Sequence, residues 1–339
     1  MNMNLEHYVP VFHIENWEDF EKIFRNSGPL VFRGQSDCSW DLTTNYEREF
    51  GTNASRESSM IKRCIAEGHL FVEHPPADND YVSWLAEMQH YGASTRLLDV
   101  SRSKYVALFF ALKDMKKGTD GAVWAFDTVR ADKMLYDELT SKVQGFYSDK
   151  AAIGNHDGIM PYQDVGWKIV NAAIGSEPAG KITDVPEDLK RCKTILNRCY
   201  SEGLVVHVVP NRINRRLLAQ QGEFLFPLNI NLTFVQNLIG AVGGNDYNGQ
   251  LHEFADANMR EQARKTTAQS VIKVVIPYSL REEFLGRLLE MNITYQTIFP
   301  DTEGFMRSLS FQQDRFRGGL KLTNSKNKGL KFSCNEFLL

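Results

Sequence analysis

Three short segments, far apart in the sequence, place polar side chains next to apolar stretches. They are FRGQ at residues 32–35, QHYGASTRLLDVS at residues 89–101 and QQGEF at residues 220–224. Arg33 follows a short apolar stretch, and a charge at the end of a buried strand is unfavourable unless an anion accompanies it. Polar groups gathered at junctions between elements are typical of functional sites. The three segments therefore predict one composite site, in which Arg33 has an anionic partner.

The spacing of apolar residues predicts the elements that position these segments. Gly28 and Pro29 end a first helix, and the strand that follows delivers Arg33. The expected neighbours of the three segments are a helix over residues 15–25, a strand over 30–32, a helix from 80 to 88, a short apolar strand before Ser101, a helix over 105–111 and a strand over 224–227.

The rest of the chain alternates further helices and strands with irregular stretches. Residues 141–185 have scattered Gly, Asp and Asn and are interpreted as a lid, an insertion or a recognition loop. From residue 311 onward six Lys and Arg residues accompany only two acids, which predicts a basic, flexible tail. The other expected elements are a polar helix over residues 58–71, strands over 121–126, 204–209 and 271–276, a helix over 185–200, and a helix that opens at Ser279 with a capping-box-like start.

The composition is that of a globular chain without a dominant charge. Among 339 residues, 39 are basic and 42 acidic, which requires neither a nucleic acid nor a membrane as partner. Five scattered cysteines without a C-x-x-C pair favour reduced thiols and no structural metal. No apolar run reaches the roughly 18 residues of a membrane helix, and the first residues do not resemble a signal peptide. We therefore expect a cytoplasmic protein.

Several of these segments together resemble the FRG-domain family, which is named after the tripeptide Phe32-Arg33-Gly34. The resemblance covers most of residues 30–305, and its second motif is long and specific. It implies an N-terminal helical segment at residues 1–29, an FRG domain at 30–310 and the basic tail at 311–339. The matching stretches are residues 32–35 with Trp40 and Leu42, residues 89–92 and 95–99, residues 219–222, residues 276–277 and residues 298–301.

The same segments are similar to the three motifs of ADP-ribosyltransferases that carry an Arg-Ser-Glu signature. Phe32-Arg33-Gly34 resembles their aromatic-Arg-Gly strand end. Ser101 stands six residues before Ala107 and matches the last serine of their Ser-Thr-Ser strand end, and Gln221-Gly222-Glu223 resembles their Gln-x-Glu motif. The resemblance implies an α+β fold with a mixed, split β-sheet core and surrounding helices.

The resemblance also implies NAD as substrate and assigns catalytic roles to Glu223, Gln221 and Arg33. Glu223 would bond the ribose 2-hydroxyl and stabilise an oxocarbenium-like transition state, and Gln221 would orient the acceptor. The Arg33 guanidinium would grip a pyrophosphate or ribose in two places, and Tyr91 or His90 would stack on nicotinamide. The residues expected to contact NAD are Arg33, Gly34, His90, Tyr91, Thr95, Arg96, Asp99 and Ser101.

The sequence departs from this pattern at the second motif, where Asp99 and Val100 replace the first two members of Ser-Thr-Ser. The hydroxyl that would hold the nicotinamide ribose is therefore missing. Either Asp99 or the nearby Thr95 substitutes for it, or the site has lost NAD chemistry.

The leading hypothesis is an NAD-dependent mono-ADP-ribosyltransferase-like enzyme that modifies a protein side chain or a nucleic-acid base. The basic tail and the trio Arg212, Arg215 and Arg216 favour nucleic acid. By resemblance the chain would act as a bacterial toxin or phage-defence effector, the former with a neutralising partner. The alternatives are a non-catalytic module that binds a nucleotide or a partner protein, and an NAD glycohydrolase.

Purely structural roles compete with each of these assignments. Arg33 could form a buried ion pair with Asp99 or Glu223, and Arg96 could pair with Asp99. His207 lies within an apolar strand and is interpreted as a core residue. The observation that separates these hypotheses is whether Arg33, Asp99 and Glu223 line one open cleft.

Overall fold

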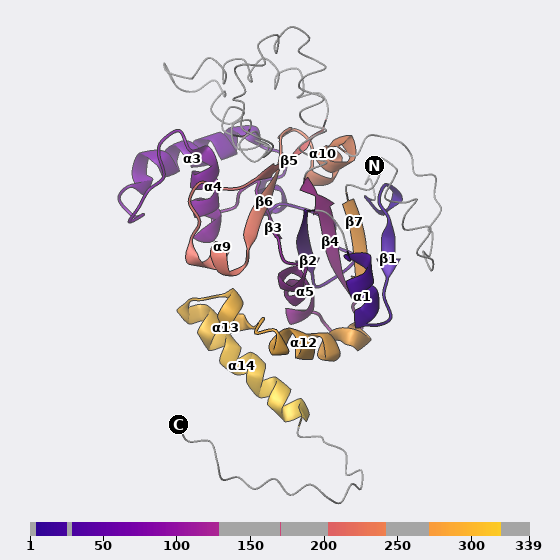
Figure 1. The fold of residues 1–339 in the computed structure, drawn as a ribbon. Coiled ribbons are helices and arrows are strands. Elements are labelled where there is room, and N and C mark those ends of the chain that lie inside the picture. Colours follow the sequence, from indigo (N-terminus) through magenta and orange to yellow (C-terminus); the bar gives the residue numbers. More distant parts are fainter. Residues whose placement is uncertain (1–4, 26–28, 129–169, 171–202, 242–270, 320–339) are drawn as a thin grey trace, which may run out of the picture.

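The chain folds around a single mixed β-sheet of seven strands. The computed structural model describes residues 5–25, 29–128, 170, 203–241 and 271–319. The strand order is β1-β7-β4-β2-β3-β6-β5, and β1 pairs with β7 in parallel while the other neighbours are antiparallel. Helices surround this sheet (Figure 1), so the fold is α+β, as the sequence predicts.

The described part of the chain contains the following strands and helices. The strands are β1 (Val11–His13), β2 (Leu30–Gln35), β3 (Leu98–Ser101), β4 (Gly121–Asp127), β5 (Val205–Val208), β6 (Gly222–Pro227) and β7 (Val271–Ile276). The helices are η1 (Leu5–His7), α1 (Trp17–Ile23), α2 (Asn45–Phe50), α3 (Ala54–Gly68), α4 (Tyr81–His90), α5 (Lys104–Lys113), α9 (Arg215–Ala219), α10 (Phe234–Ala241), η3 (Tyr278–Leu280), α12 (Arg281–Glu290), α13 (Tyr295–Ile298) and α14 (Thr302–Gly319).

Alternation along the strands divides the side chains between two faces of the sheet. Phe32 and Val123 point to the face covered by α1, α5 and α12, which is called the α5 face below. Helix α4 covers the same face at its other end, against Phe224. Val31 and Leu225 point to the opposite face, where they pack with residues of η1 and α10.

The sheet is split between β2 and β3. Only Phe32 and Ser101 are paired across these two strands, whereas β2 pairs with β4 along all six of its residues. Beyond that single pair, the backbone groups of β2 and β3 no longer face one another as a ladder. The resulting gap lies beside Arg33 and Asp99.

Gly34 allows helix α5 to lie directly on β2. A Cβ atom at this position would stand 1.8 Å from the Ala107 carbonyl oxygen and 2.6 Å from the Ala111 nitrogen. Both are backbone atoms of α5, so no side-chain movement could relieve the clash. The glycine of the Phe-Arg-Gly tripeptide is therefore required by packing.

The described residues before β2 pack with the same sheet and core as the rest. Strand β1 pairs with β7, and Trp17 and Phe20 of α1 lie in the core cluster beneath α5. At the predicted boundary of residue 311, α14 continues to Gly319, and the ring of Phe311 contacts Tyr295 at a centroid distance of 5.0 Å.

The predicted capping box at Ser279 is wrong. Helix α12 has Leu280 as its N-cap, without a side-chain cap bond. A capping box occurs instead at α13, between Thr294 and Thr297, because two hydroxyl groups can satisfy the free backbone amides there. The predicted helix over 185–200, the irregular stretch 141–185 apart from Val170, and the end of the tail lie outside the described residues.

Candidate functional site

A cavity of about 330 Å³ opens on the α5 face beside the gap between β2 and β3. This volume lies within the range of small-molecule sites. Its floor comes from β2, β3 and β6, and its walls from the end of α4, from α5 and from residues 212–220. The lining residues that the sequence singled out are Arg33, Gly34, His90, Asp99, Ser101, Arg212, Arg216 and Gln220.

Arg33 extends its side chain into the gap in the sheet. Its Nη1 donates to the backbone carbonyl of Asp99 at 2.7 Å, while its Nε is buried and has no hydrogen-bond partner among the described residues. Burial lowers the pKa of the guanidinium, the Asp99 charge opposes this shift, and the nearby Arg48 adds to it. The result is a desolvated cation that lines the cavity with a donor to spare.

Asp99 presents an exposed carboxylate to the same cavity. Its Oδ1 accepts a hydrogen bond from Gln89 Nε2 at 2.7 Å. The Gln89 amide oxygen in turn accepts from the Thr95 hydroxyl, and that hydroxyl accepts from the Leu97 amide at 3.2 Å. Three polar residues of the second motif thus form one chain that fixes the Asp99 side chain.

The turn after α4 explains the glycine of this motif. Asp80 caps the start of α4 by accepting from the Ser83 amide. The helix ends at His90, Gly92 has a φ of 88°, and the Ala93 amide returns to the Met88 carbonyl at 2.8 Å. This is the C-terminal arrangement that favours glycine, and it places Gln89 and His90 at the cavity.

Glu223 and Gln221 lie outside the cavity lining. Glu223 pairs with Val100 across β3 and β6 and points away from the α5 face, whereas the next residue, Phe224, lines the cavity. The Glu223 carboxylate is buried, 2.7 Å from His207 Nε2 and 3.2 Å from Arg102 Nε. Gln221 is exposed in the turn before β6. Arg33 and Asp99 therefore line one cavity, and Glu223 does not join them.

His207 is a core residue whose ring also contacts Glu223. It is buried in β5, as expected of a core residue, yet its ring is hydrogen-bonded to the Glu223 carboxylate. A buried carboxylate with two such partners has its charge compensated within the protein. Glu223 therefore has partners within the protein, and its carboxylate does not face the cavity.

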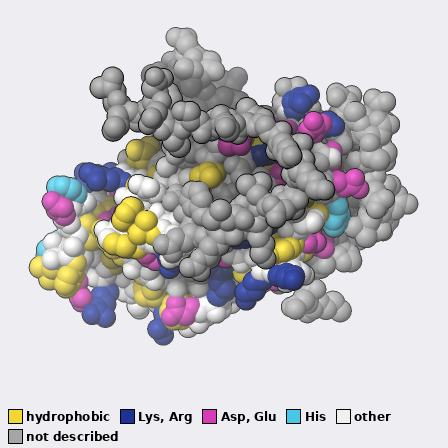
Figure 2. Space-filling view, turned by 90° about the horizontal axis from the view of Figure 1, so that it is seen from below, with side chains coloured by type: hydrophobic (Ala, Val, Ile, Leu, Met, Phe, Trp, Pro, Cys, Tyr) yellow, Lys and Arg dark blue, Asp and Glu magenta, His cyan; other side chains and the backbone are white. Residues whose placement is uncertain are grey.

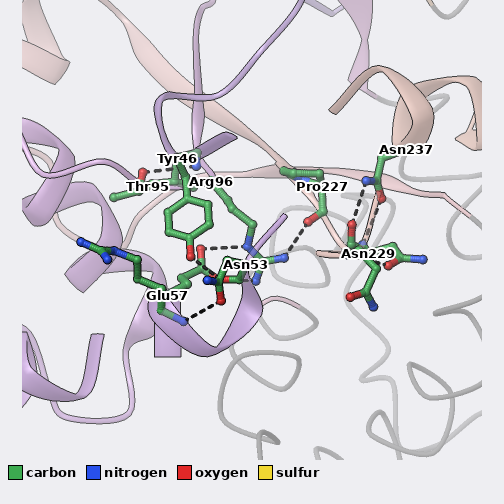
Figure 3. Close-up of polar contacts among 11 residues, drawn as sticks. Tyr46, Asn53, Glu57, Thr95, Arg96, Pro227, Asn229 and Asn237 are labelled. Carbon is green, nitrogen blue, oxygen red and sulfur yellow. Dashed lines mark hydrogen bonds and ion pairs between the residues drawn. The ribbon is translucent and has the colours of Figure 1, made fainter. Parts of the chain in front are cut away.

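Arg96 is held in a buried ion pair on the far side of the second motif (Figure 3). Its Nε and Nη2 donate to the two carboxylate oxygens of Glu57 at 2.8 and 2.6 Å, and its Nη1 donates to the Pro227 carbonyl at 3.2 Å. The guanidinium also lies 4.5 Å from the centre of the Phe226 ring. Its partner is Glu57, so the expected pairing with Asp99 is wrong.

The remaining residues expected to contact NAD differ in their access to the cavity. Thr95 is fully buried and is absent from the lining. Ser101 lines the cavity, but its hydroxyl donates to the Gln220 carbonyl at 2.7 Å and accepts from Ser103. His90 lines the cavity, and Tyr91, which is exposed, contacts the His90 ring at 4.8 Å between centroids.

Sequence reasoning missed several lining residues. Phe110 and Asn214 contribute to the walls. Arg212 and Arg216, noticed in the sequence only as basic residues, also line the cavity, and the Arg216 guanidinium lies 4.6 Å from the centre of the Phe299 ring. Their position just before the third motif, which follows directly in the chain, is the signal that could have placed them at the site.

The fold and site define an α+β protein with a cavity beside the split of its mixed sheet and a desolvated arginine in the lining. Residues 28–120 match the family model described as FRG domain. The match contains the first two motifs and ends before the third. No curated protein and no solved structure matches the chain.

The described residues contain neither a membrane-spanning helix nor a cluster of metal ligands. None of their helices has both the length and the apolar character needed to cross a bilayer. Within the same part of the chain, no three His, Cys, Asp or Glu side chains gather as they would around a metal ion.

Proposed function

We propose that the cavity binds a nucleotide, with NAD as the first candidate. The observation that carries this proposal is the state of Arg33, a desolvated cation that belongs to the cavity lining. Burying a guanidinium is costly, and an anionic ligand oxygen in the cavity would compensate its charge. A phosphate group is the ligand that suits a planar, desolvated guanidinium best.

Other lining residues suit the remaining parts of such a ligand. Arg212 and Arg216 add positive charge along the wall, which favours a pyrophosphate over a single carboxylate. His90 and Phe110 supply rings for a nicotinamide or adenine base. The three segments that resemble ADP-ribosyltransferase motifs lie on β2, β3 and β6, which are neighbours in the sheet. This arrangement supports NAD as the first nucleotide to test.

The proposal does not give Glu223 a role in chemistry. Its carboxylate is bound by His207 and Arg102 on the other face of the sheet, so a ligand in the cavity would be separated from it by the sheet itself. The site as described therefore supports nucleotide binding more directly than the transfer reaction expected of a Gln-x-Glu motif.

A second candidate function is cleavage of NAD with Asp99 as the essential carboxylate. Asp99 is exposed, lines the cavity and is oriented by Gln89. If it accepted a hydrogen bond from the ribose 2-hydroxyl, it would stabilise positive charge at the ribose as the bond to nicotinamide breaks. Nicotinamide leaves with the bonding electron pair, and an acceptor or water adds to the ribose carbon and loses a proton. This gives an ADP-ribosyltransferase or an NAD glycohydrolase.

Calorimetric titration of the full chain with NAD, ADP-ribose and inorganic phosphate tests the first proposal. We expect NAD and ADP-ribose to bind and Arg33→Met to weaken both at least tenfold. Arg63→Met is the matched control, because Arg63 lies on the surface of α3 in an exposed ion pair with Glu67. Absence of binding to the wild-type protein, or equal affinity of Arg33→Met, would remove the proposal.

An assay of nicotinamide release separates binding from cleavage. If Asp99 is the essential carboxylate, Asp99→Asn abolishes release while NAD still binds, and Glu223→Gln releases nicotinamide as the wild type does. The reverse pattern would restore the role that sequence resemblance gave to Glu223. If the wild-type protein binds NAD but releases no nicotinamide, with or without added protein and nucleic acid, only the non-catalytic binding function remains.

A further inference from the structure

We infer that the mouth of the cavity binds a single-stranded nucleic acid. The surface concerned is called the arginine rim and consists of Arg212, Ile213, Arg215, Arg216 and Leu218. It immediately precedes β6 and supplies one wall of the cavity. This inference adds a second, polymeric ligand to the nucleotide proposed above and does not require that NAD be cleaved.

The charged residues of the rim itself are all basic. Residues 211–220 contain three arginines and no acidic residue. Arg212 and Arg215 are exposed, and within the described residues neither takes part in an ion pair. Pairs of this kind do occur elsewhere on the surface, for example between Arg287 and Glu283. Clustered arginines without acidic partners favour a polyanion as ligand.

The positive charge continues from the rim into the cavity. Arg212 and Arg216 belong to both surfaces, and Arg33 lies in the cavity floor. Two acidic residues, Glu87 and Asp99, also line the cavity, so three cations face two anions there. The net positive charge of the rim and cavity therefore favours a negatively charged chain that reaches from the rim toward Arg33, rather than an isolated neutral group.

Exposed apolar side chains accompany the arginines of the rim and the His90 wall of the cavity. Ile213 is 52% exposed and Leu218 62% exposed. Tyr91, at the end of α4, is 74% exposed and contacts His90 of the cavity wall. Aromatic rings beside basic groups are what unpaired bases and their phosphates require, because the bases stack on the rings. Duplex DNA would leave these apolar groups unused.

Fluorescence anisotropy with labelled oligonucleotides tests the inference. The probes are single-stranded DNA and RNA of about 12 nucleotides, within the site size of single-strand-binding folds, together with the corresponding duplex and poly-glutamate. We expect the single strands to bind more tightly than the duplex and poly-glutamate not to compete. The charge reversals Arg212→Glu and Arg215→Glu together should weaken binding at least tenfold and reduce the salt dependence, by about 0.7 in the log–log slope for each lost phosphate contact.

Matched variants keep the result interpretable. Arg63→Glu reverses an exposed charge on α3 that belongs neither to the rim nor to the cavity lining, and it should bind the oligonucleotides as the wild type does. Arg215 does not line the cavity, so Arg215→Glu alone should weaken oligonucleotide binding without changing NAD affinity. The inference would be overturned if the wild-type protein bound no single strand, if Arg63→Glu weakened binding equally, or if poly-glutamate competed efficiently. NAD titration of the same samples shows separately whether the nucleotide proposal stands.

Discussion

The Arg33 guanidinium donates a hydrogen bond to the Asp99 backbone carbonyl at 2.7 Å, across the gap in the sheet. In a continuous antiparallel ladder, a backbone amide of β2 would supply such a bond. Here a side chain supplies it, and the same guanidinium keeps other donors for the cavity. Arg33 therefore joins the two halves of the sheet and lines the ligand site at once.

Replacing Arg33 with lysine tests whether the shape of the guanidinium matters beyond its charge. An ammonium group cannot reach the Asp99 carbonyl and hold a phosphate in two places simultaneously. We expect Arg33→Lys to lower NAD affinity at least tenfold, equivalent to about 1.4 kcal/mol, as measured by calorimetry. Arg102→Lys is the control, because Arg102 lies directly after β3 but contacts Glu223 instead of the cavity. Equal affinity of the two variants would contradict the role given to Arg33.

Gly34→Ala should destabilise the fold through a backbone clash. The added methyl group would meet the Ala107 carbonyl oxygen at 1.8 Å, so α5 must move away from β2, at a cost of about 3 kcal/mol or more. Gly121→Ala is the comparison, since its nearest obstacle is the flexible end of Met115 at 2.5 Å, and it should lose less. Urea unfolding of both variants measures the difference. A Gly34→Ala protein as stable as Gly121→Ala would show that α5 is not held so closely.

The buried ion pair between Arg96 and Glu57 predicts strong coupling between these two residues. Removing one partner leaves an uncompensated buried charge, so Arg96→Met and Glu57→Gln should each lower the free energy of unfolding by about 3–5 kcal/mol. The double variant should lose less than the sum of the two, because no charge remains unpaired. Denaturant unfolding of the four proteins gives the coupling energy. If the two losses in the free energy of unfolding are additive, the interaction between Arg96 and Glu57 contributes little to stability.

Tyr105 and Tyr295 predict a loss of stability in alkali. Burial, together with a hydrogen bond and the charge of Glu21, raises the pKa of Tyr105 to about 12, and burial beside Asp114 raises that of Tyr295 to about 12. Because the folded pKa exceeds the ordinary value near 10, the contribution to stability is complete below pH 10. It is lost as the pH rises toward 12.

Phenylalanine variants isolate this effect. The double variant Tyr105→Phe and Tyr295→Phe should lose less stability between pH 10 and pH 12 than the wild type, as measured by urea unfolding at each pH. Phenolate absorbance of the wild type should show that Tyr105 and Tyr295 are among the tyrosines that titrate late. Tyr91→Phe, which changes an exposed residue, serves as control. Identical pH profiles for wild type and double variant would contradict the prediction.

The strands and helices nearest the site could be predicted because their apolar residues are regularly spaced. The helix that leads to Gln89, the strand after Leu97 and the helix that contains Phe110 occur as expected, within a few residues. The position of Arg33 on a strand next to β3 also follows the prediction of a composite site. Such patterns arise from residues that are close together in the chain, so they can be recognised in the sequence alone.

The face to which Glu223 points could not be predicted. Strand β6 begins at Gly222, earlier than the apolar run from Phe224 indicates, and its register with β3 places Glu223 opposite Val100. A shift of one residue would exchange Glu223 and Phe224 between the two faces. That register depends on pairing between segments more than a hundred residues apart, and neither segment specifies it alone.

Among the described strands, β1 is an edge strand whose only neighbour, β7, is synthesised near the other end of the chain. In a nascent polypeptide emerging from the ribosome, β1 therefore lacks this neighbour until residues 271–276 have been translated. Such late closure slows folding and lengthens the interval in which unpaired edges can aggregate. Truncation before residue 271 should for this reason yield insoluble material, rather than a smaller working domain.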